Sequence, residues 1–293
     1  MVKEMMIGSH GFGLRLLMAG LLVVLFTLHS VQPAVASTPS SLIISNVRDT
    51  SFTVSWLTGA EEVGQVQVVG GGVYDDVRGA DYHGITHYVT VKGLTPNTNY
   101  SFDLLSGGTR YEGGGAHWAV TTGKTLTPPM PDLILGRVRN PDGSNAADAI
   151  VVFTVEQQRQ ISAPLSMLVT ASDKGFFHVN LADLREQADP SHFFEYSPAG
   201  DLLTIQAVNP FGSGSIKVGL GDPRLRASDP QQTLTVDLQT PSETPTLVVR
   251  QPTPTPIPPA PAPESSGLWL GVGAAAIIGI GILIVAVLFV WRR

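Results

Sequence analysis

The 293-residue sequence contains no cysteine. Disulfide bonds, thiol nucleophiles and thiolate metal sites are therefore excluded, and any folded domain must be stabilised by packing. A recognisable catalytic arrangement is also missing, because no serine lies in a Gly-x-Ser-x-Gly nucleophile elbow although serine, histidine and aspartate are all present. We expect a protein that is not an enzyme and carries no cofactor.

Positive charge is scarce in the central part of the chain. Between Ser37 and Ser266 there are 14 lysines and arginines against 23 aspartates and glutamates, a net charge of −9. Such a surface repels phosphate backbones, so nucleic acid is excluded as an expected partner.

Two apolar runs flank this acidic part. The run Leu268–Val290 has no charge and no proline, and at about 1.5 Å of rise per residue a helix of this length crosses a bilayer core of about 30 Å. Tryptophans at both ends and the final Arg292-Arg293 pair suit a span that ends in the cytoplasm. We predict one transmembrane helix over 267–291, a cytoplasmic tail at 292–293 and an ectodomain outside the cell membrane.

The first 36 residues resemble a secretory signal peptide. A short apolar run, Leu16–Leu28, follows Lys3 and Arg15 and precedes the small-x-small sequence Ala34-Val35-Ala36. This order predicts cleavage after Ala36. An uncleaved N-terminal anchor is the alternative.

Small residues recur every fourth position in the predicted membrane helix. This spacing permits close packing against a second helix, and hence helix-mediated self-association. The residues of this face are Gly267, Gly271, Ala275 and Gly279.

Residues 37–123 show the alternation of an all-β sandwich, with apolar residues at every second position and turn residues at short intervals. The stretches NVRDTSFTVSWLT, VTVKGLTPNTNYSFDL and HWAVTT resemble a fibronectin type III domain. The resemblance implies structural roles for four residues, which are Trp56, Leu94, Pro96 and Tyr100. The middle of this segment is also similar to the N-terminal module of purple acid phosphatases, but no metallophosphatase pattern follows it.

A proline-rich linker, 124–131, separates this segment from a second set of predicted strands over 132–239. The stretches GRVRNPDGSNAADAIVVFTV and TASDKGFFHVNL resemble a carboxypeptidase regulatory-like or prealbumin-like β-sandwich, whose implied role is spacing. Residues 183–188 are predicted to form either a short helix or a loop. We therefore expect an all-β protein with two tandem β-sandwiches.

Nine prolines occur in the 27 residues from Thr240 to Ser266. Such a stretch favours extended polyproline II at about 3.1 Å per residue. It predicts a stalk over 240–266 that holds the sandwiches away from the membrane, or a passive tether.

Two groups of side chains are candidate sites. Carboxylates and imidazoles close in sequence could ligate a metal, but they fall in loops and strands where this spacing does not converge, so no metal site is predicted. These residues are Asp75, Asp76, Asp81, His83 and His87. Aromatic side chains that we expect to be exposed, among glycines and polar residues, are the better binding candidates. They are Tyr74, Tyr82, Tyr88, Tyr111 and Trp118, and the alternative is that they belong to the core.

Together these features favour a non-catalytic bacterial protein, anchored by a single membrane span, that displays a binding or adhesion module at the cell surface. Its expected partner is an unidentified protein or a surface polysaccharide. The first alternative is a structural subunit of a cell-envelope complex that docks through its helix and sandwich edges. An accessory module of a surface hydrolase is the least favoured alternative.

Overall fold

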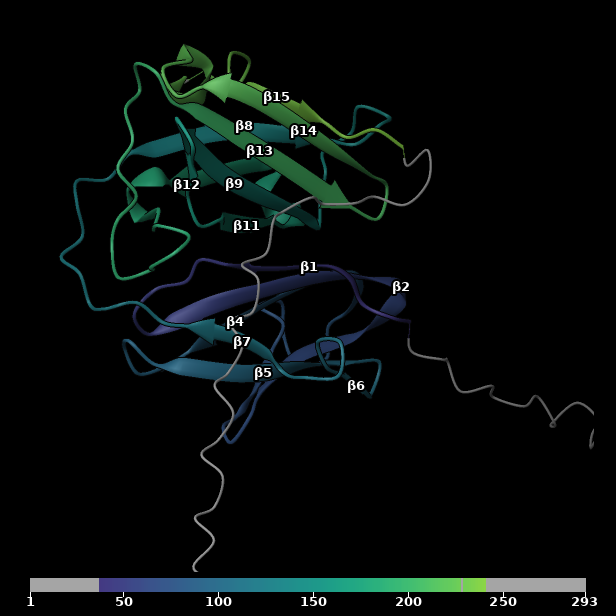
Figure 1. Ribbon diagram of the computed structural model, residues 1–293. Coiled ribbons are helices and arrows are strands. Elements are labelled where there is room, and N and C mark those ends of the chain that lie inside the picture. Colours follow the sequence, from purple (N-terminus) through teal and green to yellow (C-terminus); the bar gives the residue numbers. More distant parts are fainter. Residues whose placement is uncertain (1–36, 228, 241–293) are drawn as a thin grey trace, which may run out of the picture. The chain divides into compact units, whose positions relative to one another are not determined.

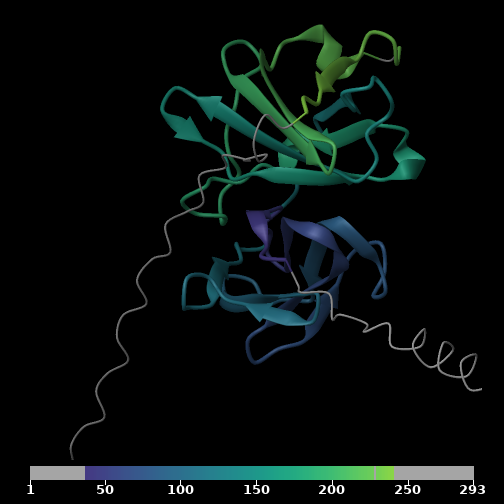
Figure 2. The same cartoon turned by 90° about the vertical axis from the view of Figure 1, so that its right-hand side faces the viewer.

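The computed structural model describes residues 37–227 and 229–240. In this part of the chain the regular structure is almost entirely β-strand, with three short 3₁₀ turns (Figure 1 and Figure 2). The expected all-β, sandwich-like class is confirmed. The predicted signal peptide, stalk and membrane helix lie outside the described residues, within which no helix has the length and apolarity to cross a membrane.

The N-terminal sandwich is built from seven strands. They are β1 (Ser40–Ser45), β2 (Ser51–Val68), β3 (Val73–Asp75), β4 (His83–Lys92), β5 (Asn99–Ser106), β6 (Thr109–Tyr111) and β7 (Trp118–Thr121). All their pairings are antiparallel.

Strand β2 belongs to both layers of this sandwich. Its first half pairs with β1 and β4, and its second half pairs with β3 and β5, while β4 continues beyond the register shift to Glu62 and Val63. The register with β4 shifts between Leu57 and Glu62, where Gly59, Ala60 and Glu61 are exposed. A bulge of this kind bends a strand and increases its twist, so one continuous strand passes from one layer to the other.

The core of the N-terminal sandwich lies between these layers. Phe52 and Phe102 pack with ring centroids 5.3 Å apart, and Trp56 is fully buried. Leu94 is buried at the turn before β5, and Pro96 precedes Asn97, whose φ of 50° makes the turn. These residues therefore close the end of the sandwich that leads into β5.

The C-terminal sandwich contains eight strands. They are β8 (Leu133–Arg139), β9 (Ala149–Gln157), β10 (Gln160–Ile161), β11 (Leu165–Val169), β12 (Phe176–Asn180), β13 (Leu202–Asn209), β14 (Gly212–Gly219) and β15 (Leu234–Asp237). One sheet has the order β10-β9-β13-β14 with β11 also paired to β9, and the other has the order β12-β8-β15. Strand β15 pairs with β8 in parallel.

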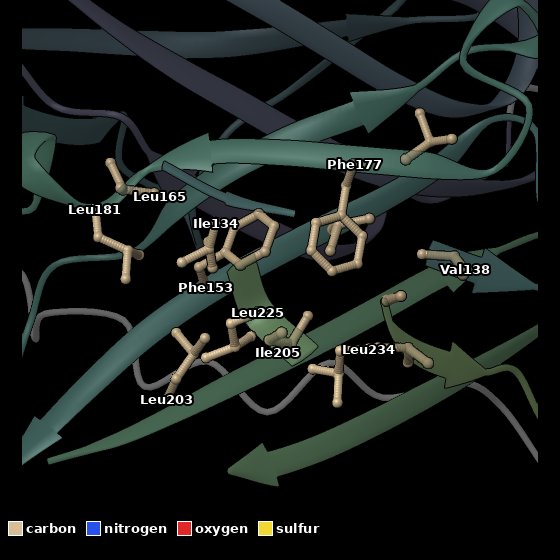
Figure 3. Close-up of a cluster of buried hydrophobic side chains, with 14 of the residues drawn as sticks. Ile134, Val138, Phe153, Leu165, Phe177, Leu181, Leu203, Ile205, Leu225 and Leu234 are labelled. Carbon is tan, nitrogen blue, oxygen red and sulfur yellow. The ribbon is translucent and has the colours of Figure 1, made fainter. Parts of the chain in front are cut away.

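The two sheets of the C-terminal sandwich enclose a larger apolar cluster, in which side chains such as Phe153, Ile205 and Leu234 converge (Figure 3). Phe153 and Phe177 pack edge to face, with centroids 5.2 Å apart. Gly136 lies against the ring of Phe177, and a Cβ atom there would come within 2.2 Å of it. Only glycine therefore fits beneath this ring.

The 3₁₀ turns are η1 (Ala171–Asp173), η2 (Leu181–Asp183) and η3 (Pro223–Arg226). Residues 183–188 form no helix beyond the end of η2, so the loop alternative is correct. Their chain instead makes single bridges, Ser162 with Glu186 and Arg185 with Phe193.

The hydroxyl of Tyr100 accepts a hydrogen bond from the N–H of Thr95, five residues upstream, at 2.8 Å. Tyr100→Phe removes this acceptor and leaves the ring in place, so the free energy of unfolding should fall by about 1 kcal/mol. Urea denaturation followed by tryptophan fluorescence measures the change. An unchanged denaturation midpoint would contradict a stabilising role for this bond.

Candidate functional site

Three of the five predicted binding aromatics pack partly against the N-terminal core. They are Tyr74, Tyr111 and Trp118. The indole of Trp118 stacks on Phe102 at 6.0 Å. These rings therefore do not form one exposed patch. They pack against the core, which was the alternative to a binding role.

Tyr82 and Tyr88 take part in polar contacts instead. The guanidinium of Arg78 lies 3.7 Å from the centre of the Tyr82 ring and bonds Asp76 through Nε at 2.8 Å and Nη2 at 2.9 Å. Arg78 also contacts Asp148, which precedes β9, at 2.8 Å. The expectation that Tyr88 is exposed is wrong, because its side chain packs against residues of the C-terminal sandwich and only 7% of the residue is exposed.

The predicted metal candidates do not converge. Asp76 is buried and accepts bonds from Arg78 and from the N–H of Tyr88, whereas Asp75 is exposed and bonds Gln65. Asp81 and His83 are exposed, and His87 is buried. Among the described residues, the group whose ligand atoms do lie within 4.8 Å of one another is Asp103, Glu112 and His117.

This second group is held together by an arginine. The buried carboxylate of Asp103 accepts from Nε of Arg110 at 2.8 Å and lies 2.8 Å from Nδ1 of His117. Glu112 lies 3.7 Å from the same arginine. The charge of Asp103 is therefore already balanced by protein groups.

A polar network connects the N-terminal sandwich to β11. Asn46 has a left-handed backbone with φ 50°, and its N–H donates to the carbonyl of Pro164 at 3.0 Å. Its side-chain amide accepts from the N–H of Ser166 at 2.9 Å and donates to the carbonyl of Ser166 at 3.0 Å. The Tyr88 hydroxyl donates to the same carbonyl at 2.9 Å. Asn46 therefore occupies the edge of β11 as a neighbouring strand would.

An apolar cluster surrounds this network. It combines residues of both sandwiches, which are Ile43, Leu57, Tyr88, Ile150, Val152, Leu168 and Val208. Each of them is at most 7% exposed. The bond from the Tyr88 hydroxyl to the carbonyl of Ser166 is buried beside this cluster, and burial strengthens it.

An open cleft of about 590 Å³ lies beside this junction. Serine and threonine side chains of β2 and β4, with Arg48 and Lys92, line it from the N-terminal sandwich. Met167, Leu168 and His178 of β11 and β12 are among the residues that line it from the C-terminal sandwich. The cleft is the candidate functional site, and no residue predicted to bind lines it except Tyr88.

The cleft carries positive charge on an acidic chain. Asp183 is the one carboxylate among its lining residues, and it pairs with Arg48 at 2.7 Å. Arg185 is buried near this pair, and burial together with the charge of Arg48 lowers the pKa of its guanidinium. Among the described residues, its Nε and Nη1 atoms have no hydrogen-bond partner. Arg185 does not line the cleft, and its guanidinium lies 4.1 Å from the centre of the Phe193 ring. The positive charge of the lining that no carboxylate balances is that of Lys92, and it favours an anionic ligand.

His87 makes the stability of the N-terminal sandwich depend on pH. Its ring stacks on Trp56 at 4.9 Å, and its Nε2 lies 3.1 Å from the hydroxyl of Thr58, which itself donates to the carbonyl of Ala60. Nε2 therefore carries the proton, and within the described chain the buried Nδ1 has no partner. Burial lowers the pKa of His87 to about 4, although nearby Asp76 opposes this shift and Arg78 adds to it.

The unfolded chain takes up a proton at His87 below its ordinary pKa, whereas the folded chain does not until about pH 4. Stability should therefore fall as the pH drops, by about 2 kcal/mol between about pH 7 and about pH 5 from this group. His87→Gln should reduce the pH dependence seen in urea denaturation. The exposed His83→Gln is the control, and equal slopes for the two variants would contradict the assignment.

Asn46→Asp tests the network at β11. The variant tolerates the left-handed backbone but places a carboxylate oxygen where the amide donates to Ser166, so the free energy of unfolding should fall by about 2–3 kcal/mol. Asn97→Asp is the matched control, because Asn97 has the same φ of 50° and is exposed. Calorimetry of both variants measures the difference. Equal losses would show that the amide of Asn46 contributes nothing beyond its backbone conformation.

Comparison with known proteins matches one family model and 63 chains of solved structures. The chain is similar to the crystal structure of chicken CNTN1 FN1–FN3 domains, with 15% identity over 63% of this chain and 65% of that chain and a TM-score of 0.22. The match spans less than two thirds of that structure's length. No curated protein matches the sequence. Residues 37–122 match the family described as Fibronectin type III domain, and this part of the chain is therefore a fibronectin type III domain.

Proposed function

We propose that the protein is a non-catalytic binding or adhesion module displayed at the surface of a bacterial cell. The observation that carries this proposal is the fibronectin type III domain at residues 37–122, a module of the kind that serves surface binding. The cationic cleft beside it supports the proposal, because it offers such a module a place for a ligand.

The proposed architecture has two tandem sandwiches, 37–123 and 132–239, on a stalk that ends in one membrane helix. For the second sandwich we propose a carboxypeptidase regulatory-like fold. It is supported by Gly136, which fits beneath Phe177, and by Gly143, whose φ of 83° is the backbone that an Asp-Gly turn requires.

A structural subunit of an envelope complex is the second candidate. The unpaired position on the edge of β11, described below, favours it, because strand edges are common docking sites. Cross-linking of intact cells that carry the tagged full-length chain separates the two functions. One abundant protein attached to residues 37–239 and retained in fixed stoichiometry would indicate a complex subunit, and attachment to several proteins or to wall polymer would indicate a displayed binding module.

Surface display is tested with the full-length chain carrying a C-terminal tag in a bacterial host. We expect a mature N-terminus at Ser37, membrane association that resists carbonate, and digestion of the ectodomain when protease is added to intact cells. A chain that ends at residue 266 is the matched control and should appear in the medium. Protection of the full-length chain from protease would contradict surface display.

A further inference from the structure

The outer edge of β11 has one unpaired position in the cleft. Ser166 turns its backbone groups away from β9, because both of them bond the side chain of Asn46. Residues alternate in direction along an antiparallel strand, and β11 pairs with β9 without a register shift. The backbone of Leu168 therefore faces outward as well. In the described ranges, 37–227 and 229–240, no protein group bonds its N–H or its C=O.

The positions on either side of Leu168 are closed by side chains. Asn46 bonds Ser166, and the carboxylate of Asp173 accepts from the N–H of Thr170 at 2.7 Å. Leu168 itself is only 6% exposed. Its side chain packs in the apolar cluster, and the residue lines the cleft. Its backbone N–H and C=O are therefore a donor and an acceptor that a ligand backbone can satisfy.

Strand β12 offers a second donor beside the first. The N–H of His178 points away from β8, and its acceptor is the thioether sulfur of Met167 at 3.4 Å. Sulfur is a weak acceptor. Both His178 and Leu168 line the cleft. A ligand backbone that enters the cleft can therefore form hydrogen bonds with the backbone of Leu168 on β11 and with the N–H of His178 on β12.

The charge and the chemistry of the lining restrict the ligand further. Arg48 and Lys92 are the cations of the lining, against the single carboxylate of Asp183. Among the lining residues there is no exposed tryptophan, tyrosine or phenylalanine on which a sugar ring could stack, because Tyr88 is buried. The strand edges can pair with the backbone of a peptide, and the cations can contact its carboxylates.

We propose that the cleft binds an extended acidic segment of a partner protein, whose backbone pairs with β11 at Leu168 and whose carboxylates contact Arg48 and Lys92. This inference rests on the proposed binding function and adds the class of its partner.

The test uses the full-length protein in mild detergent and fluorescence anisotropy of a labelled peptide that alternates glutamate with valine. Two matched peptides carry glutamine for glutamate, or N-methyl groups at alternate backbone amides. The glutamate peptide should bind, and both changes should weaken binding about tenfold or more. Lys92→Glu should do the same. Arg159→Glu, an exposed charge reversal in the β9–β10 turn outside the cleft, is the control and should have no effect.

Amide hydrogen exchange locates the bound peptide, which should slow exchange at Leu168 and His178. Equal weakening by Lys92→Glu and Arg159→Glu would overturn the proposal in favour of general charge attraction. Undiminished binding of the N-methylated peptide, or binding of polygalacturonate without binding of the peptide, would also overturn it. A peptide that fails to bind while the chain is still displayed on cells rejects this inference alone, whereas loss of display rejects the proposed function.

Discussion

The side-chain amide of Asn46 closes the edge of β11 with two hydrogen bonds to Ser166, and the junction between the two sandwiches is built around this contact. It brings the outer face of β4 against the C-terminal sandwich, where Tyr88 becomes buried. The same contact ends at Ser166, so the next outward position of β11 stays open. The side chain of Asn46 forms the hydrogen bonds that a neighbouring strand would form with Ser166. Both the junction and the open position in the cleft follow from this.

The cleft differs from the ion-paired groups at Arg78 and Asp103 in how its charges are balanced. At Arg78 and at Asp103 each buried or half-buried charge has an opposite charge within hydrogen-bond distance. Near the cleft, Arg185 has no such partner and Lys92 is exposed. An accessible cation that no carboxylate balances, such as Lys92 in the lining of the cleft, is a stronger sign of an anionic ligand than the balanced group at Asp103.

Local patterns in the sequence predicted much of the fold and little of the site. Alternation identified the strands around Phe52 and Phe153, since each buries one face. The sequence of β14, GSGSIKVG, gives almost no alternation, because glycine and serine occupy more than half of its positions. The local pattern placed Tyr88 at the surface, since a pattern cannot show that another domain covers the outer face of β4. The cleft depends on Asn46 and Ser166, which are 120 residues apart, and no local signal connects them.

The long strand β2 has a further consequence. Because its two halves hydrogen-bond into different layers, neither layer of the fibronectin type III domain can open without pulling on a strand of the other. Local opening is thereby coupled across the whole domain, which should unfold in a single cooperative step and not sheet by sheet. For the surface display that we propose, such all-or-none behaviour would remove the partly open states in which exposed strand edges aggregate and proteases cut.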